Sequence, residues 1–294
     1  MSEHFSDRTR MMLGDDGYES LSSACVAIFG IGGVGGFATE ALARAGVGEL
    51  HLFDSDTVSV SNINRQILAT HLTVGQYKTE AARDRILSIN PDCRVVCHNI
   101  FYSEETEDEI DLTKFDYIVD AIDSVRSKIA LICRAKELGV QIISAMGAGN
   151  KLNPTAFKVS DISKTRVCPL AKTVRVALRK RGINHLKVVY SEEEAVKPRG
   201  IWDLSNNTNG SQSTEGILPE EAEDNLTENG KAAAKDNATP QNSPENPENI
   251  PQSATESPEQ SYQMRTPPAS VSFVPSVMGL VMAGEVILDL SVRR

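Results

Sequence analysis

The sequence has no pair of cysteines spaced as Cys-x-x-Cys, and its five cysteines are odd in number and scattered. A zinc site of four thiolates needs such pairs, so the spacing excludes one. An odd, scattered set also gives no disulfide framework. Residues 1–10 are polar and lack the apolar core of a secretory signal. We therefore expect a cytoplasmic protein whose thiols are free.

Long hydrophobic runs are missing as well. The most apolar stretch, residues 271–283, is followed by Glu285 and Asp289, and it is shorter than the roughly 20 residues that cross a bilayer. We expect no membrane span. The helical spacing of apolar residues over 271–290 predicts that this segment returns to the folded core.

The net charge of −10 belongs to one segment. Residues 203–262 hold twelve Asp or Glu and two Lys or Arg, which leaves 28 acidic and 28 basic side chains elsewhere. The acidity therefore says nothing about what the folded part binds. Residues 203–264 are rich in Asn, Ser, Pro and Glu and have no periodicity, so we predict a disordered acidic insert. The folded domain would then comprise residues 1–202 and 265–294.

Strand and helix patterns alternate over residues 24–145, which predicts a doubly wound, Rossmann-like α/β sheet that is mostly parallel. After residue 147 the rhythm changes to a few additional irregular strands. Predicted strands are residues 24–29, 49–53, 94–99, 117–121, 141–145, 157–161 and 186–190. Predicted helices are residues 34–45, 76–89, 104–111, 128–138 and 169–180.

A glycine-rich turn, GIGGVGG, follows the first predicted strand and begins a helix. Gly30, Gly32, Gly33 and Gly35 allow the backbone to approach a phosphate, and open amides at a helix N-terminus bind its charge. Asp54 ends the second strand, where a carboxylate can accept ribose hydroxyls. The turn predicts a nucleotide site but fits a dinucleotide and a mononucleotide equally well.

Cations downstream of the turn favour a triphosphate. Arg65 lies in the segment SNINRQ, residues 61–66, and Lys78 follows thirteen residues later. A hydride-transfer enzyme holds its cofactor largely with backbone amides, whereas a triphosphate about to lose pyrophosphate needs positive charge at the leaving oxygens. The pattern therefore favours ATP over NAD.

The segment DAIDS, residues 120–124, ends a buried strand at the sheet edge where ligands bind. Asp123 offers a hard oxygen ligand for Mg²⁺. Asp120 stands at the strand end itself, and we expect it to brace the loop.

Taken in order, GIGGVGG, Asp54-Ser-Asp56, SNINRQ, Lys78 and DAIDS resemble the adenylating domain shared by ubiquitin-activating enzymes and the bacterial activators of sulfur-carrier proteins. That family usually has Asn where Ser124 stands, and Ser still forms a hydrogen bond. The resemblance implies ATP binding by Gly30, Gly32, Gly33, Gly35, Asp54, Asp56, Ser61, Asn62, Ile63, Asn64, Arg65, Gln66, Lys78, Asp123 and Ser124. It implies catalytic roles for Arg8, Arg65, Lys78 and Asp123, with Asp123 holding Mg²⁺.

Motifs outside the ATP site resemble one branch, the tRNA threonylcarbamoyladenosine dehydratases. They include RTRMMLG at residues 8–14, MGAG at 146–149 and SFVPS at 272–276. This resemblance implies that the chain activates the carboxylate of the modified adenosine in tRNA with ATP and Mg²⁺ and closes it into a ring. It also implies a homodimer in which Arg8 reaches the partner's ATP site.

Residues 164–187 hold eight cations and no Asp or Glu. Such a concentration binds phosphate backbones, so we predict a tRNA-facing surface here. Helical spacing places Val174, Ala177 and Leu178 on the inward side. The residues predicted to contact tRNA are Lys172, Arg175, Arg179, Lys180 and Arg181.

Three other functions share part of this pattern. An activator of a sulfur-carrier or ubiquitin-like protein has the same ATP residues, but it works with a carrier or sulfur-transfer protein and commonly has two Cys-x-x-Cys pairs. An NAD-dependent oxidoreductase explains the glycine turn and Asp54 but leaves Arg65, Lys78 and Asp123 without a role. A non-catalytic nucleotide-binding module needs no cluster of cations. Cys168 is expected to be a packed or surface thiol.

Overall fold

The structure is a computed structural model that describes residues 4–199 and 268–292. The predicted acidic insert at residues 203–264 lies outside the described residues, so its disorder and the domain boundaries drawn around it stay predictions. In chain order, the elements are α1 (Asp7–Ser22), β1 (Cys25–Phe29), α2 (Gly35–Ala45), β2 (Glu49–Phe53), η1 (Val60–Asn62), α3 (Lys78–Ile89), β3 (Arg94–His98), η2 (Glu107–Glu109), η3 (Leu112–Lys114), β4 (Tyr117–Asp120), α4 (Val125–Glu137), β5 (Gln141–Ala145), η4 (Pro154–Ala156), β6 (Phe157–Asp161), η5 (Ile162–Lys164), α5 (Pro169–Arg179), β7 (Lys187–Ser191) and α6 (Phe273–Ser291).

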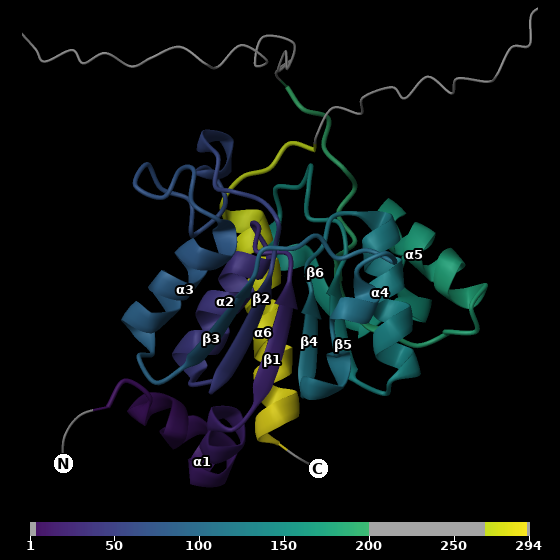
Figure 1. The fold of residues 1–294 in the computed structure, drawn as a ribbon. Helices are drawn as coiled ribbons and strands as arrows, with labels where there is room; N and C mark the ends of the chain where they lie inside the picture. The colour runs from purple at the N-terminus through teal and green to yellow at the C-terminus, as the bar shows by residue number, and fades with distance from the viewer. Residues whose placement is uncertain (1–3, 200–267, 293–294) are drawn as a thin grey trace, which may run out of the picture. The chain divides into compact units, whose positions relative to one another are not determined.

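The strands form one sheet in the order β3-β2-β1-β4-β5-β7-β6. Every neighbouring pair is parallel except β6 and β7. Side chains alternate between the two faces, so β1 contributes Val26 and Ile28 to one apolar cluster and Ala27 and Phe29 to the other. Helices α2, α3 and α6 cover the first face, and α4 and α5 cover the second (Figure 1). The predicted doubly wound α/β fold is confirmed.

The order of the strands places the site. Connections from β1 lead to β2 and β3 on one side, whereas β4 lies on its other side. The glycine turn after β1 and the DAIDS segment after β4 therefore lie next to each other at the carboxyl edge, where the strand order reverses. Ligands bind at this switch point in doubly wound sheets.

Two local predictions differ from the structure. The helix expected at residues 104–111 is reduced to the single turn η2. The Thr106 hydroxyl donates to the Phe101 carbonyl at 2.9 Å and accepts the Ser103 amide at 3.0 Å, and such side-chain bonds compete with helix formation. The sequence analysis did not predict α1, which is kinked at Gly14, where φ is +75°.

The predicted C-terminal core helix is confirmed as α6. Eighteen consecutive residues of this 19-residue helix have a mean hydropathy of 1.7, so the helix is long and apolar enough to cross a membrane. Length alone therefore does not exclude a span, but packing identifies a core helix. Val274, Met278 and Met282 are fully buried, and a Cβ added at Gly279 would lie 2.2 Å from the Val34 carbonyl oxygen of the α2 N-cap.

Candidate active site

The glycine turn packs directly against the loop after β4. Gly30 has a φ of +87°, and a Cβ added there would lie 2.7 Å from the Ala121 carbonyl oxygen. At Gly35 an added Cβ would lie 1.8 Å from the Gly30 carbonyl oxygen. No side chain fits at either position. Within residues 4–199 and 268–292, the amides of Gly33 and Val34 donate to no other group, so two donors before α2 remain available for phosphate oxygens.

Asp54 holds this turn in place. One carboxylate oxygen accepts the Ile31 amide at 2.7 Å, and the other accepts the Asp56 amide at 2.9 Å. Each carboxylate oxygen still has a lone pair left, so the predicted bond to a ribose hydroxyl stays a prediction. The structure adds a second role for Asp54, which is to hold the glycine turn through the Ile31 amide. The sequence did not indicate this role, because it depends on contact between the loop after β1 and the loop after β2.

Lys78 begins α3 beside the same turn. Its Nζ lies 2.6 Å from an Asp56 carboxylate oxygen and 3.6 Å from an Asp54 carboxylate oxygen, and only 8% of its side chain is exposed. A partly desolvated ammonium acts more strongly on a nearby phosphate than a solvated one does. The structure thus brings together Asp54, Asp56 and Lys78, three of the predicted ATP residues.

Arg65 and Gln66 lie against the other side of the glycine turn. Positions for added Cβ atoms at Gly33 and Gly32 are 3.5 Å from Arg65 Cγ and 3.8 Å from Gln66 Nε2. Gln66 is 6% exposed, and its Oε1 has no hydrogen-bond partner in the described part of the chain. An orphaned, buried acceptor beside an open glycine turn fits a nucleotide that would supply the missing donor.

The rest of the segment 61–66 mainly shapes the loop. Asn62 Oδ1 accepts the Ser59 amide at 3.1 Å, and Asn64 Nδ2 donates to the Ser270 carbonyl at 3.0 Å. Arg65 donates to the Ser61 carbonyl at 2.9 Å, and Ile63 packs against the first apolar cluster. Their direct contact with ATP stays a prediction.

A buried ion pair anchors the DAIDS loop. Lys128 Nζ lies 2.8 Å from Asp120 Oδ2, and both side chains are fully buried. Ser144 Oγ donates to the same oxygen at 2.5 Å, while Asp120 Oδ1 accepts the Ile122 amide at 3.1 Å. Asp120 therefore braces the loop, as expected, and sequence reasoning missed only its partners Lys128 and Ser144.

Asp123 stands at the tip of the braced loop, where its side chain is exposed. Ser124 is the N-cap of α4, and its Oγ accepts the Ser127 amide. The capping bond explains how serine serves where the resembling family usually has Asn, because both are good N-cap residues. An exposed carboxylate beside a phosphate-binding turn suits Mg²⁺, and that role stays a prediction.

None of the five thiols is exposed. Cys168 is the N-cap of α5, and 4% of it is exposed, so the packed thiol predicted for it is confirmed. Burial raises the pKa of the Cys97 and Cys133 thiols and takes that of Cys93 to about 12. A buried, protonated thiol is a poor acyl acceptor.

The basic segment is only partly open to solvent. Arg175 is half-buried and donates to the Thr165 carbonyl at 2.9 Å, Arg166 pairs with Glu192 at 2.7 Å, and Lys187 pairs with Asp289 at 2.7 Å. Ala177 is half-buried, whereas Val174 and Leu178 are fully buried as predicted. Arg175 thus has a structural partner that the sequence analysis did not anticipate.

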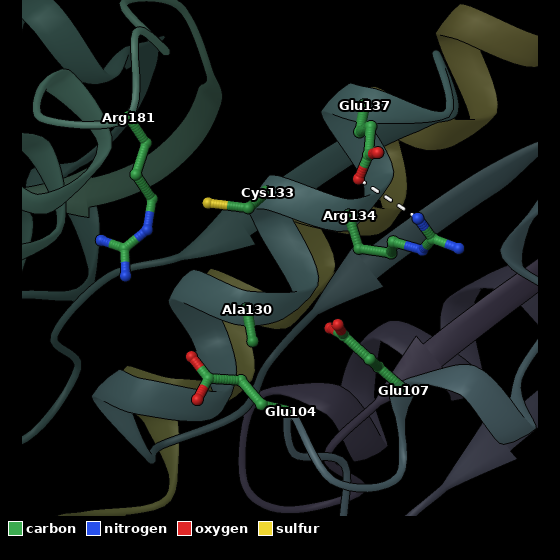
Figure 2. Close-up of a pocket in the computed structure, with 7 residues that line it drawn as sticks. All are labelled: Glu104, Glu107, Ala130, Cys133, Arg134, Glu137 and Arg181. Carbon is green, nitrogen blue, oxygen red and sulfur yellow. Dashed lines mark hydrogen bonds and ion pairs between the residues drawn. The ribbon is translucent and has the colours of Figure 1, made fainter.

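Arg181 faces acidic surroundings. Figure 2 shows Arg181 beside Cys133 of α4, with Glu104 and Glu107 below Cys133 and with Arg134, which pairs with Glu137 at 3.2 Å, on its other side. These residues line a groove with a volume of about 310 Å³. Carboxylates repel phosphate, so the predicted tRNA contact of Arg181 has the least support. The exposed residues Lys172, Arg179 and Lys180, named the α5 cations below, form no ion pair with any described residue.

Arg8 lies on α1, at the far end of α6 from the glycine turn. The glycine turn lies against the first turns of α6, because a Cβ added at Gly33 would lie 3.3 Å from Pro275. Helix α1 lies against the last turn of α6, because a Cβ added at Gly17 would lie 3.3 Å from the Ser291 carbonyl oxygen. The 19 residues of α6 span about 28 Å at about 1.5 Å per residue. The structure therefore does not bring Arg8 to the ATP residues of its own chain.

A switch-point sheet with a phosphate-binding turn, a desolvated lysine and a carboxylate loop defines a nucleotide-binding α/β protein. The chain belongs to the ThiF family, whose family model matches residues 6–291. The family resemblance predicted from the motifs is thereby confirmed.

Similarity to individual proteins extends over nearly the full chain. The tRNA threonylcarbamoyladenosine dehydratase of Bacillus subtilis is 37% identical over 288 residues, covering 98% of this chain and 94% of that protein. The crystal structure of Escherichia coli tRNA N6-threonylcarbamoyladenosine dehydratase in complex with AMP has a TM-score of 0.70 and 26% identity, covering 98% of this chain and 97% of that one. The same protein in complex with ATP has a TM-score of 0.63 and 36% identity, covering 66% and 83%.

Proposed function

We propose that this protein uses ATP to activate the carboxylate of threonylcarbamoyladenosine in tRNA and closes it into a cyclic form. The observation that carries the proposal is a site with open backbone amides and cations for phosphate but no exposed thiol. Such a site can form an acyl-adenylate, yet it offers no cysteine to receive the acyl group. A ring closure within the substrate needs no such cysteine.

The reaction has two steps. A carboxylate oxygen of the substrate attacks the α-phosphorus of ATP, the bond to the bridging oxygen breaks, and pyrophosphate leaves. A nucleophile in the same side chain then attacks the activated carbonyl carbon, and AMP leaves. The nucleoside therefore loses the elements of one water.

Each residue has a defined task in these steps. The amides of Gly33 and Val34 bind phosphate oxygens, and Lys78 and Arg65 stabilise the charge that develops on the leaving pyrophosphate. Asp54 keeps the turn in shape, and Asp120 and Lys128 keep Asp123 at the carboxyl edge. Bound at Asp123, Mg²⁺ would neutralise phosphate charge.

The proposed reaction predicts a definite product. Incubation with ATP, Mg²⁺ and tRNA bearing threonylcarbamoyladenosine should convert that nucleoside into a species lighter by one water, which mass spectrometry of the digested tRNA detects. Exchange of pyrophosphate into ATP should require the modified tRNA, because its threonylcarbamoyladenosine supplies the carboxylate that attacks ATP. Conversion without ATP, or none with it, would contradict the proposal.

An activator of a sulfur-carrier protein remains the second candidate. It shares every ATP residue with the first, and it predicts adenylation of a protein C-terminus in place of a nucleoside. In an NAD-dependent oxidoreductase, Lys78 and Gln66 would have no role in cofactor binding or catalysis. We place the protein in the cytoplasm, in keeping with tRNA as substrate and with five free cysteines.

We further propose a homodimer with ATP sites completed by Arg8 of the partner. Arg8 lies too far from its own glycine turn, and an arginine supplied in trans stabilises phosphate charge. Arg8→Ala and Lys78→Ala should each be inactive. Mixed after subunit exchange, they should regain about one quarter of the activity, because half of the dimers would carry one complete site. No recovery in mixed dimers of proven composition would contradict the arrangement.

The α5 cations are proposed to bind the tRNA backbone. Changing Lys172, Arg179 and Lys180 together to Glu should weaken tRNA binding and flatten its salt dependence by up to about 3 log–log units, about one for each phosphate that the variant no longer neutralises. ATP binding should stay unchanged, and Lys114→Glu, an exposed charge reversal elsewhere, serves as control. Unchanged tRNA affinity in the triple variant would move the RNA site elsewhere and favour a protein substrate.

A further inference from the structure

A polar cluster lies at the amino edge of the sheet, opposite the glycine turn. Cys25 begins β1, Glu49 begins β2, and the strand register pairs them directly. His51 follows Glu49 by two residues, so its side chain leaves the same face of the sheet. The Cys25 Sγ, a Glu49 carboxylate oxygen and a His51 ring nitrogen all lie within 4.8 Å of one another, and all three residues are half-buried.

We propose that Cys25, Glu49 and His51 bind a zinc ion at a site separate from the ATP site. One sulfur, one nitrogen and one oxygen are ligands that Zn²⁺ accepts at ordinary distances, while a thiolate disfavours Mg²⁺ and Ca²⁺. A second carboxylate is close, because Asp116 Oδ2 accepts the Cys25 amide at 2.9 Å. Asp116 is exposed, so water is the expected fourth ligand.

The histidine is held as a metal ligand should be. His51 Nε2 lies 2.7 Å from Glu49 Oε1, and His51 Nδ1 lies 3.0 Å from His98 Nε2. The His98 ring stacks on Phe53, with centroids 4.1 Å apart and planes 3° apart. A partner on the second ring nitrogen fixes the orientation of a ligating histidine, so Nε2 faces Glu49, and a metal bound between them would replace their hydrogen bond.

The charges around the cluster favour a cation. A Glu49 carboxylate oxygen lies within 4.8 Å of the Cys25 Sγ, and the Asp116 carboxylate accepts the Cys25 amide. Arg94, 3.1 Å from Glu49, is the cation beside them, and its side chain is 72% exposed, so solvent screens it. A divalent ion would supply charge at the centre of the cluster and displace the thiol proton.

Residues 4–199 and 268–292 offer no competing place for such an ion. All five cysteines and all five histidines lie within the described residues, since residues 200–267 contain neither. In the described ranges, this is the one group of three potential ligands within reach of a single metal. Sequence spacing did not reveal it, because Cys25 and His51 meet only through strand pairing.

Cobalt titration of the chelator-stripped, full-length protein tests the site, because Co²⁺ takes zinc's place and reports a thiolate ligand by charge-transfer absorption. The wild type should bind one equivalent with that absorption, and Zn²⁺ should displace it. Cys25→Ser and His51→Gln should each lose the absorption and bind more than about 100-fold more weakly, since even changes to residues that only orient the ligands cost about 10–100-fold. Zn²⁺ should raise the melting temperature of the wild type but not of Cys25→Ser.

Cys133→Ser is the matched control, because Cys133 is also a half-buried thiol but has no histidine beside it. It should retain the absorption and the zinc-dependent melting temperature. Circular dichroism verifies folding, and if Cys25→Ser does not fold, Glu49→Gln and His51→Gln decide in the same way. Absorption that survives Cys25→Ser, or none in the wild type, overturns the proposal. ATP–pyrophosphate exchange is read separately, so failure of the zinc site leaves the proposed reaction untouched.

Discussion

Replacement of Lys128 by methionine is expected to lower the free energy of unfolding by about 3–5 kcal/mol. The Lys128 ammonium and the Asp120 carboxylate, 2.8 Å apart, are both fully buried. Methionine fills much of the same volume but leaves the carboxylate without a counter-charge in an apolar layer. Denaturant unfolding, compared at equal m-values, measures the loss.

A double variant separates the charge from the packing. Asp120→Asn combined with Lys128→Met removes both charges, while the Asn side-chain oxygen can still accept the Ile122 amide and the Ser144 hydroxyl. Because a neutral replacement of a buried pair is often nearly neutral in stability, the double variant should recover at least half of the loss. A Lys128→Met protein as stable as the wild type would show that the pair contributes nothing.

Lys78→Ala and Asp123→Ala are each expected to reduce ATP–pyrophosphate exchange by at least about 100-fold, because losing one preorganised charge from such a site costs about 10²–10³ in rate. For Lys78 the effect has two parts. The variant loses an ammonium that is only 8% exposed, and it leaves the Asp54 and Asp56 carboxylates facing the phosphates unneutralised.

Controls make this result specific to the site. Lys114→Ala removes a lysine that is 70% exposed and should exchange pyrophosphate at the wild-type rate. Lys78→Arg keeps the charge and should retain part of the activity, although its fork differs in geometry. Circular dichroism confirms folding of each variant. Wild-type exchange by Lys78→Ala or Asp123→Ala would remove that residue from the site.

Local patterns in the sequence were enough to predict most elements. The strands Glu49–Phe53, Gln141–Ala145 and Phe157–Asp161 begin and end where they were predicted, since short apolar runs bounded by turn residues have few alternatives. The glycine turn was equally clear, because Gly30 and Gly35 each occupy a place that no side chain fits. The α1 helix escaped prediction, since Gly14 interrupts its periodicity.

Among the predicted site residues, those near one another along the chain were the easiest to place. The roles of Lys78 and Asp123 beside the glycine turn stay predictions. The sequence by itself determined the alternation of strands and helices and the glycine turn that follows the first strand. These follow from periodicity and from backbone geometry, which act over a few residues. Only the tertiary structure decided which side chains meet across elements. It buried Lys128 against Asp120, engaged Arg175 with Thr165 and brought Cys25 to His51, because strand order and helix packing join residues that no spacing along the chain connects.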